Sequence, residues 1–220
     1  MTSALYGVYG ASGCGRGVLP LLRQSLAKNG ILEDRLVFVD DDPKAPTLNG
    51  HRVVDFKTFA SIPAAMRYVT IAIADSRTRE LLWRRCHEKG IEPLTIRADN
   101  VVCMDAVTIG PGAILSPFVT LTSNIRIGKA FHANIYSYIE HDCVIGDFVT
   151  FAPNASCNGN IHIEDHAYIG SAAVIKQGSP GNPLVIGKGA VVGMGAVVTR
   201  SVPPGVTVVG NPARPLNKAS

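Results

Sequence analysis

The sequence predicts two domains of different fold classes: an α/β domain at the N-terminus and a parallel β-helix of hexapeptide repeats at the C-terminus. Two observations support this prediction. Strand and helix patterns alternate up to about residue 98, whereas a six-residue hydrophobic period begins near residue 107 and continues almost to the end. A fixed period of this kind is typical of solenoid proteins, in which each repeat buries its apolar side against its neighbours.

The N-terminal pattern begins with an apolar strand, LYGVY, that runs into the glycine-rich turn GASGCGRG. A helix is predicted over VLPLLRQSLAKNG, where a glycine marks the expected end. A second strand, RLVFV, ends in the acidic residues 40–42, and a short segment follows around residues 56–60. The stretch YVTIAIADSRTRELLWRRCHEKG supplies a third strand and a second amphipathic helix, so we expect a small parallel sheet.

Two rows of mostly small or β-branched residues carry the hexapeptide period. The rows lie two residues apart, the spacing at which two side chains of one strand point to the same side. The first row contains Ile109, Leu115, Leu121, Ile127, Ala133, Ile139, Ile145, Phe151, Cys157, Ile163, Ile169 and Ile175, then Ile186, Val192 and Val198. The second row contains Val107, Ala113, Val119, Ile125, Phe131, Ser137, Cys143, Val149, Ala155, Ile161, Ala167 and Ala173. We therefore expect both rows to fill the interior of the coils.

The period is broken once, by the segment KQGSPGNPL around residues 176–184. Its prolines and glycines predict a loop that leaves the solenoid. Such a loop is either a plain surface loop or part of a binding site, since loops on one face of a repeat protein often form the binding face.

The composition excludes several classes of protein. The chain has 220 residues, a net charge of +4 and no long apolar run, and its basic residues are not interleaved with aromatic ones, so neither a membrane nor nucleic acid is an expected partner. The first residues, MTSALYGVYGAS, lack the basic region of a signal peptide, and we expect a cytoplasmic protein. The five cysteines form no CxxC motif and predict reduced thiols without a metal site.

Four segments, GVYGASGCGRGV, FVDDDP, NIYSYIEHDCVIGDFVTFAP and VVGNPARPL, together resemble the bacterial nucleotide-sugar acyltransferases related to the sialic acid O-acetyltransferase family. The resemblance covers essentially the whole chain. It implies a Rossmann-like nucleotide-sugar-binding domain over residues 1–98 and a left-handed parallel β-helix over residues 99–220. It also implies a homotrimer with active sites between subunits.

The activity implied by this resemblance is transfer of an acetyl group from acetyl-CoA to the C4 amine of a nucleotide-linked 4-amino-4,6-dideoxy sugar. A GDP-linked sugar is the first choice and a UDP-linked sugar the alternative. A role in the synthesis of O-antigen or another surface glycan follows from the resemblance alone.

The reaction requires a base, because an amine that attacks a thioester must lose a proton, and a neutral imidazole accepts one near pH 7. We predict that His141 is this base, since it stands two residues past the inward Ile139, where the coil turns outward. By resemblance, Asp142 raises its basicity and Asn134 positions the histidine or the sugar amine. Adjacent side chains of a strand diverge, so contact between His141 and Asp142 requires the bend of a coil corner. The alternatives are an exposed corner histidine and a turn asparagine.

The resemblance also assigns two sets of binding residues. The diphosphate, nucleoside, base or ribose is expected to contact Ser12, Gly13, Cys14, Asp40, Asp41 and Asp75. The cofactor acetyl-CoA is expected to contact Thr150, where relatives often have a histidine, and the segments Gly170–Ser171 and Gly193–Met194. Arg214 either meets a CoA phosphate or is solvated. The alternatives are an acidic strand end that caps nothing and glycines that only form turns.

Three rival classes remain open at this point. Some β-helices are trimeric zinc carbonic anhydrases, for which His132, His162 and His166 are the candidate ligands. The glycine-rich turn is also compatible with a NAD-dependent oxidoreductase, although the β-helix then has no role. The third is a non-catalytic scaffold whose N-terminal domain binds a nucleotide.

Overall fold

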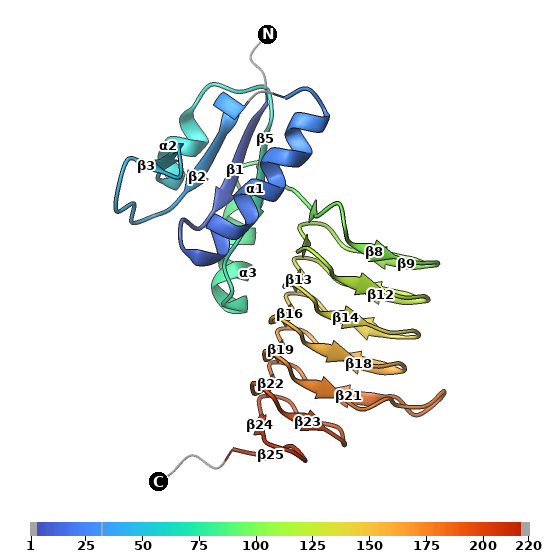
Figure 1. Cartoon of the computed structure of the whole chain (residues 1–220). Coiled ribbons are helices and arrows are strands. Elements are labelled where there is room, and N and C mark those ends of the chain that lie inside the picture. Colours follow the sequence, from blue (N-terminus) through green and yellow to red (C-terminus); the bar gives the residue numbers. More distant parts are fainter. Residues whose placement is uncertain (1–3, 32, 217–220) are drawn as a thin grey trace. The chain divides into compact units, whose positions relative to one another are not determined.

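The computed structural model describes residues 4–31 and 33–216, and it divides the chain into two compact units, one up to Ile96 and one from Arg97 onward. The N-terminal unit is an α/β fold with a six-stranded sheet in the order β3-β4-β2-β1-β5-β6 (Figure 1). The strands are parallel except at the β3–β4 pair. The elements of this unit are β1 (Leu5–Tyr9), α1 (Gly13–Lys28), the short 3-10 helix η1 (Glu33–Arg35), β2 (Leu36–Val39), β3 (Thr47–Leu48), β4 (His51–Val54), α2 (Phe56–Ser61), β5 (Arg67–Ile71), α3 (Ser76–His87) and β6 (Glu92–Pro93).

The central strand β1 is buried along its whole length, with helices on both faces of the sheet. On one face, Leu5 and Tyr9 pack in one hydrophobic cluster with side chains of α2 and α3. Gly7 points to the same face, where an added Cβ would lie 2.9 Å from the ring of Phe59, so glycine leaves the room that this aromatic side chain fills. The strand order reverses at β1, because β2 lies on one side of it and β5 on the other. Ligands of open α/β sheets bind at such a reversal, outside the carboxyl ends of the strands.

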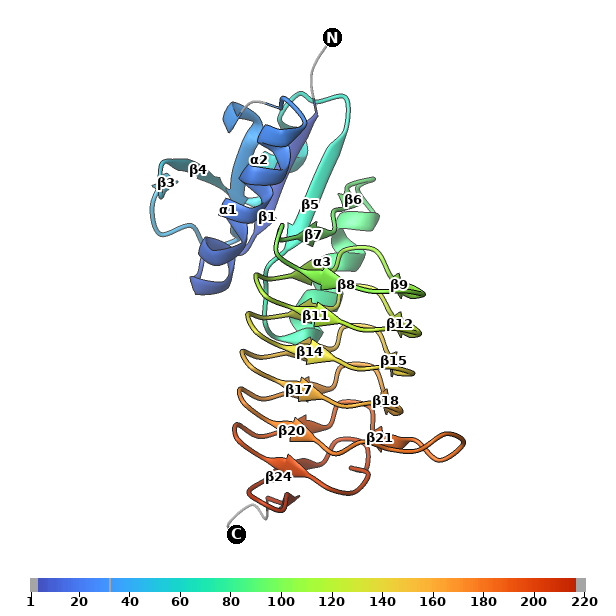
Figure 2. The ribbon, with the colours of Figure 1, turned by 45° about the vertical axis from the view of Figure 1, so that its right-hand side comes forward.

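The C-terminal unit is a parallel β-helix with three sheets that form the sides of a prism (Figure 1, Figure 2). The eight-stranded side contains β7 (Ile96–Arg97), β10 (Ile114–Leu115), β13 (His132–Ala133), β16 (Thr150–Phe151), β19 (Tyr168–Ile169), β22 (Val191–Val192), β24 (Thr207–Val209) and β25 (Arg214–Pro215). The six-stranded side contains β8 (Val102–Cys103), β11 (Thr120–Leu121), β14 (Tyr138–Ile139), β17 (Ser156–Cys157), β20 (Val174–Ile175) and β23 (Val197–Val198). The five-stranded side contains β9 (Val107–Ile109), β12 (Ile125–Ile127), β15 (Val144–Ile145), β18 (Ile161–Ile163) and β21 (Leu184–Ile186).

Residues eighteen positions apart stack on one another, because three hexapeptides complete one coil. On the eight-stranded side, Leu115 pairs with Ala133, Ala133 with Phe151, and Phe151 with Ile169. The two inward rows predicted from the sequence are confirmed: every member from Ala113 to Val198 is buried. Val107 and Ile109, in the first coil, are only half-buried.

The turns between the sides form three corners, and two of them contain the predicted site residues. The first corner, between the eight-stranded and six-stranded sides, comprises residues 116–119, 134–137, 152–155, 170–173 and 193–196. The second corner, between the six-stranded and five-stranded sides, comprises residues 122–124, 140–143, 158–160, 176–183 and 199–201. In most of these turns one residue has a positive φ, for example Tyr136 at 59° and Asp142 at 59°. This conformation turns the chain from one side of the prism to the next within a few residues.

The expected loop is present between β20 and β21 and extends beyond the coils (Figure 2). The coil that contains it is five residues longer than the others, since Ile169 pairs with Val192 instead of a residue eighteen positions on. At the end of the chain, β25 pairs antiparallel to β24 and closes the last coil.

All five cysteines carry free thiols, as the sequence predicted. Across residues 4–31 and 33–216, no helix combines the length and the apolar character needed to cross a membrane.

Candidate active site

His141 and Asp142 lie side by side at the second corner, in the turn between β14 and β15. The Nδ1 atom of His141 is 2.8 Å from Oδ2 of Asp142. The contact that needed a bend is therefore present, and its cause is local: Asp142 has a φ of 59°, in the left-handed region, so its carboxylate turns back toward the preceding ring. Both side chains are about half exposed, 46% for His141 and 48% for Asp142, so the pair is accessible from outside the coil.

The pairing with Asp142 determines which imidazole nitrogen can act as a base. A carboxylate only accepts hydrogen bonds, so Nδ1 of His141 must carry the proton in this contact. In the neutral ring, Nε2 then has a free lone pair. Within the described part of the chain, no hydrogen-bond partner occupies Nε2. The geometry thus presents an unprotonated imidazole nitrogen at an accessible corner, held by a carboxylate behind it.

Two further residues complete this site, and the sequence reasoning missed both. The side-chain amide of Asn124 donates a hydrogen bond to Oδ1 of Asp142 at 3.2 Å. Gly159 lies under the imidazole, because a Cβ added there would be 2.5 Å from Cε1 of His141. A usable signal was present in the sequence: Asn124 precedes Asp142 by eighteen residues, and Gly159 follows His141 by eighteen, the length of one coil.

Asn134 does not meet His141 within the chain. It lies at the first corner, before β14, whereas His141 lies at the second corner, after that strand. Its side-chain oxygen accepts a hydrogen bond from the backbone N–H of Ile135 at 2.8 Å, and its backbone oxygen accepts one from Ser137. Within one subunit a strand separates Asn134 from His141, so its role in positioning the histidine or the sugar amine stays a prediction.

The glycine-containing segments expected to contact acetyl-CoA lie at the first corner, as Asn134 does. Ser171 and Met194 occupy the first corner, and the side chain of Met194 is 80% exposed. Gly170 and Gly193 are close-packing glycines at this corner, because a Cβ at Gly170 would lie 2.6 Å from the backbone oxygen of Val192. A Cβ at Gly193 would likewise lie 2.7 Å from a side-chain carbon of Val209, on the next coil. Glycine is therefore required at both positions by the close approach of the next coil, and contact with acetyl-CoA stays a prediction.

Thr150 was expected to take the place of a cofactor-binding histidine. It lies on β16 and is only 7% exposed, so its hydroxyl presents little surface to a ligand. Arg214 is exposed on β25, and its guanidinium donates to the backbone oxygen of Ala213 at 3.0 Å.

The segments predicted to bind the nucleotide follow β1, β2 and β5, which are adjacent in the sheet. The glycine-rich turn after β1 leads into α1, where Ser12 occupies the N-cap position and makes no side-chain capping bond. Ser12, Gly13 and Cys14 are all exposed. The turn requires glycine where the helix approaches the strand: a Cβ at Gly15 would lie 1.7 Å from the backbone oxygen of Gly10. The first turn of the helix thus has free backbone N–H groups that can face a phosphate.

The acidic residues after β2 are engaged, which contradicts the alternative of a strand end that caps nothing. Asp40 accepts hydrogen bonds from the backbone N–H of Ala11 at 3.0 Å and of Asp42 at 3.0 Å, and so ties the glycine-rich turn to the end of β2. Asp41 accepts a hydrogen bond from the hydroxyl of Tyr9 at 2.7 Å and pairs with Arg85 at 2.7 Å. Burial and the bond to Asp41 raise the pKa of Tyr9, so this hydroxyl stays protonated and donates.

Residues 72–75, the segment after β5 that contains the predicted ligand-binding Asp75, are held by a buried arginine. One guanidinium nitrogen of Arg79 donates to the backbone oxygens of Ile73 at 2.8 Å and Ala74 at 3.1 Å. Burial lowers the pKa of Arg79 to about 10, so it keeps its charge at neutral pH. Asp75 is the N-cap of α3 and accepts a hydrogen bond from the backbone N–H of Thr78 at 2.7 Å.

The capping bond predicts a stability effect at Asp75. Replacing Asp75 by alanine should lower the free energy of unfolding by about 1 kcal/mol, the usual cost of a lost N-cap, measured by urea denaturation. Asp75→Asn is the matched control, because asparagine caps a helix as well as aspartate does. An unchanged midpoint for Asp75→Ala would contradict the capping role. A raised KM of Asp75→Asn for a nucleotide sugar would show that the carboxylate also binds ligand.

The same bond has a pH dependence. Hydrogen bonds from the side chain and backbone of Thr78 hold the pKa of Asp75 below its usual range. A lowered pKa in the folded state stabilises the protein fully above the unfolded-state pKa of about 3.9 and is lost as the pH falls through the lower folded value. Below about pH 4, wild type should therefore lose stability that Asp75→Asn does not lose. Identical acid unfolding of the two proteins would contradict this expectation.

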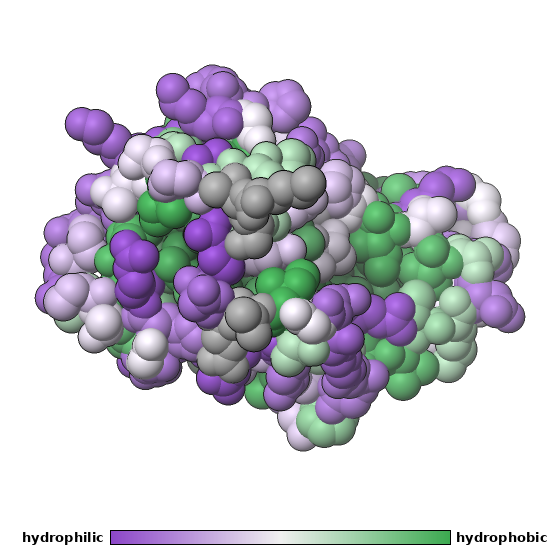
Figure 3. Space-filling model, turned by 90° about the horizontal axis from the view of Figure 1, so that it is seen from above, coloured by the Kyte–Doolittle hydropathy of each residue, from purple (hydrophilic) through white to green (hydrophobic). Residues whose placement is uncertain are grey.

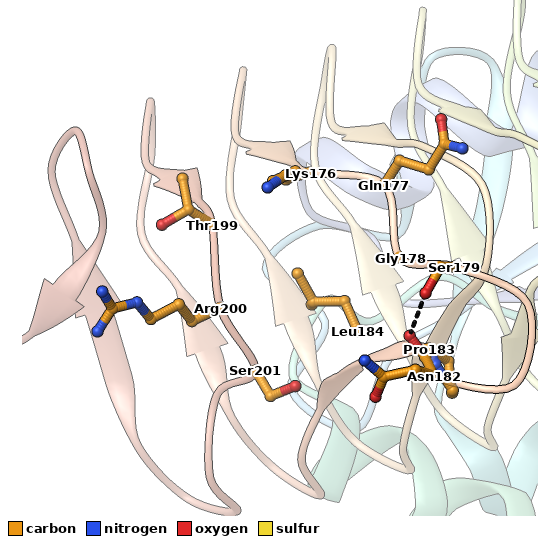
Figure 4. A pocket seen from close by; sticks show the side chains of 10 residues that line it. All are labelled: Lys176, Gln177, Gly178, Ser179, Asn182, Pro183, Leu184, Thr199, Arg200 and Ser201. Carbon is orange, nitrogen blue, oxygen red and sulfur yellow. Dashed lines mark hydrogen bonds between the residues drawn. The ribbon is translucent and has the colours of Figure 1, made fainter.

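The loop between β20 and β21 borders an open hollow of about 420 Å³ (Figure 4). The hollow is lined by Lys176, Gln177, Gly178, Ser179, Asn182, Pro183, Leu184, Thr199, Arg200 and Ser201. In the loop, the hydroxyl of Ser179 donates to the backbone oxygen of Asn182 at 3.4 Å. The hollow lies at the same corner as His141 but does not include it.

The three histidines considered as zinc ligands do not form a group. His132 lies on β13 and His162 on β18, in different sides of the prism. His166 is buried and stacks on Phe148 with ring centroids 5.3 Å apart. Among the residues that the structure describes, no cluster of three or more His, Cys, Asp or Glu side chains could hold a metal ion.

Comparison with known proteins agrees with the fold. No protein-family model matches the chain. A structure of WeeI from Acinetobacter baumannii AYE superimposes with a TM-score of 0.95 at 59% identity, and covers 97% of this chain and 100% of its own. The acetyltransferase domain of PglB from Neisseria gonorrhoeae FA1090, in complex with acetyl coenzyme A, has a TM-score of 0.84 at 25% identity, and covers 98% of this chain and 100% of its own. The fold and the site therefore define a hexapeptide-repeat acetyltransferase.

The sequence of a GDP-perosamine N-acetyltransferase from Escherichia coli O157:H7 is 51% identical over 215 residues, which are 98% of this chain and 97% of that protein. The chain belongs to the GDP-perosamine N-acetyltransferase family. This confirms the resemblance to the nucleotide-sugar acyltransferases that the four motifs predicted.

Proposed function

We propose that the protein transfers an acetyl group from acetyl-CoA to the C4 amine of a GDP-linked 4-amino-4,6-dideoxy sugar, with GDP-perosamine as the first choice. The observation that supports this most strongly is the His141–Asp142 pair at an accessible corner, in a chain that aligns with a GDP-perosamine N-acetyltransferase over nearly its whole length. The PglB acetyltransferase domain was solved in complex with acetyl coenzyme A, which supports the same acetyl donor for this protein. A UDP-linked 4-amino sugar is the alternative substrate.

The proposed roles of the two units follow from their folds. The N-terminal unit, residues 1–98 in the sequence-based division, is a Rossmann-like domain that binds the nucleotide at the carboxyl ends of β1, β2 and β5. The C-terminal unit is a left-handed β-helix, the hand that the hexapeptide period and the family imply. The free N–H groups at the start of α1 support binding of a diphosphate, because the helix N-terminus carries a partial positive charge.

In the proposed reaction, the sugar amine attacks the carbonyl carbon of the thioester. A nitrogen–carbon bond forms and the carbon–sulfur bond breaks. The proton of the amine passes to Nε2 of His141, and the imidazolium then gives a proton to the sulfur of CoA, which leaves as the free thiol. Asp142 accepts a hydrogen bond from the N–H group at Nδ1 throughout and stabilises the imidazolium that forms. No acetyl-enzyme is required, because the amine is itself the nucleophile.

Association into a trimer is part of this proposal. Asn134, Ser171 and Met194 lie at the first corner, whereas His141 lies at the second, so a site that uses all of them needs the first corner of a neighbouring subunit. The first corner is apolar: Phe118 and Tyr136 are stacked with ring centroids 4.8 Å apart, yet both are at least half exposed. Hydrophobic residues also lie on the face of the molecule seen in Figure 3. Exposed apolar side chains that gather at one place favour association.

The test of the function is a substrate panel. Purified protein with acetyl-CoA should release CoA thiol rapidly with GDP-perosamine, more slowly with UDP-linked 4-amino sugars, and most slowly with the corresponding 4-hydroxy sugars, because an amine is the stronger nucleophile. Mass spectrometry should find one added acetyl group on the sugar. Binding of the nucleotide sugar without thiol release from any member of the panel would favour the scaffold alternative over the enzyme.

A further inference from the structure

The catalytic pair is bracketed by two residues on the coils directly before and after it. Asn124 stacks beside Asp142 from the preceding coil, and Gly159 lies under His141 from the following coil. We propose that Asn124 and Gly159 are positioning residues for acetyl transfer: Asn124 fixes the carboxylate of Asp142, and Gly159 provides the space in which the imidazole of His141 lies. This inference rests on the proposed role of His141 as the base.

Asn124 acts on the half of the carboxylate that the histidine does not use. Its amide nitrogen donates to Oδ1 of Asp142, while Oδ2 faces Nδ1 of His141. The Asp142 side chain is 48% exposed, so a single contact to an equally exposed imidazole would leave it free to rotate into solvent. A second hydrogen bond, from a neighbouring coil, engages the other oxygen and so restricts rotation of the carboxylate. It thereby fixes the ring orientation and the tautomer that leaves Nε2 available.

Gly159 acts by the absence of a side chain. A Cβ there would lie 2.5 Å from Cε1, 2.6 Å from Nε2 and 3.0 Å from Nδ1 of His141, so the imidazole rests directly over the backbone of the next coil. The backbone does not require glycine at this position, because Gly159 is absent from the residues with positive φ. The space for the ring is therefore the remaining reason for glycine. Any side chain must push the reactive nitrogen out of its place.

Both residues should affect the rate of transfer more than binding. A displacement of a reacting group by about 1 Å can cost a hundredfold in rate. We therefore expect Gly159→Ala to lower kcat by about tenfold or more and Asn124→Ala by about threefold to tenfold, with the KM values for both substrates within about twofold of wild type. A merely structural role would lower the melting temperature and would not separate kcat from KM in this way.

The chain offers a matched control for the asparagine. Asn49 also has a positive φ, 50° against 59° for Asn124, but lies in the turn between β3 and β4 of the N-terminal unit, outside the segments predicted to bind ligand. Ala106 and Ala172 already adopt this conformation in other coils, so alanine is compatible with the turn. Asn49→Ala should therefore keep the kcat of wild type. In protein labelled with ¹³C-histidine, Asn124→Ala and Gly159→Ala should shift the ring signal of His141, whereas Asn49→Ala should not.

The closing experiment combines these changes with loss of the base. Wild type, His141→Asn, Gly159→Ala, Asn124→Ala and both double variants with His141→Asn are assayed with acetyl-CoA and GDP-perosamine. If Gly159 and Asn124 act through the imidazole, neither change lowers the residual rate of His141→Asn further. If His141→Asn itself keeps wild-type turnover, the proposed function of the pair fails. If His141→Asn loses turnover while Gly159→Ala and Asn124→Ala keep it, only the positioning inference is overturned. Should Gly159→Ala fail to fold, Asn124→Ala alone decides.

Discussion

His141→Asn should lower kcat by at least about tenfold, and up to the 10²–10⁴-fold range for loss of a general base, while the fold remains intact. Asparagine can still fill the corner and donate a hydrogen bond to Asp142, but it has no nitrogen that accepts a proton from the attacking amine. The measurement is the initial rate of thiol release at saturating acetyl-CoA and nucleotide sugar. Circular dichroism and gel filtration should match wild type, because His141 is half exposed and belongs to neither inward row.

Asp142→Asn provides the graded comparison for this variant. It keeps the shape of the pair but removes the negative charge that stabilises the imidazolium, so its kcat should fall less than that of His141→Asn. Turnover of His141→Asn close to that of wild type would refute the assignment of the base. Equal losses for the two variants would indicate that the carboxylate is as necessary as the imidazole.

The double change Phe118→Glu with Tyr136→Glu should abolish association and, with it, activity. Two adjacent carboxylates replace a stacked aromatic pair at the first corner, which faces a neighbouring subunit in the proposed trimer. Burial of unpaired charge in an interface costs several kcal/mol, enough to dissociate a trimer at micromolar concentration. Sedimentation or light scattering should show a monomer. The rate should fall by at least about tenfold, because His141 then lacks the first-corner residues of a neighbour.

A control separates the loss of the interface from the added charge. Leu81, on α3, is 58% exposed and lies outside the β-helix, so Leu81→Glu adds charge to an exposed apolar position elsewhere. It should remain trimeric and active. A fully active monomer of the Phe118 and Tyr136 variant would overturn the proposal that the site is shared between subunits.

The interior of the β-helix was predictable from the sequence because its geometry is periodic. A six-residue repeat fixes which side chains point inward, and the burial of the rows from Ala113 to Val198 follows from that period. The glycine-rich turn after the first strand was predictable for a similar reason, since the chain must reverse from strand to helix within a few residues. The place of Gly15 against the backbone of Gly10 shows how little room this reversal leaves.

The surroundings of the predicted residues were harder to predict from the sequence, because they depend on contacts between positions far apart in the chain. The sequence placed Asp40 and Asp41 at a strand end but did not reveal that Ala11, Tyr9 and Arg85 engage them. Those partners come from another strand and from a helix, and no local pattern links them. Asp75 was expected to bind ligand, and the structure adds a capping bond to Thr78 that any binding role must share.

By itself, the sequence determined the two fold classes, the inward rows, the loop and the histidine at a coil corner, because each depends on spacing along one chain. Only the tertiary structure decided how the corner residues relate to one another. It showed that Asn134 and His141 occupy different corners, while Asn124 and Gly159 adjoin His141 and Asp142 from neighbouring coils. The physical reason is the winding of the chain: coils bring residues eighteen positions apart into contact and keep residues seven positions apart on opposite ends of a strand.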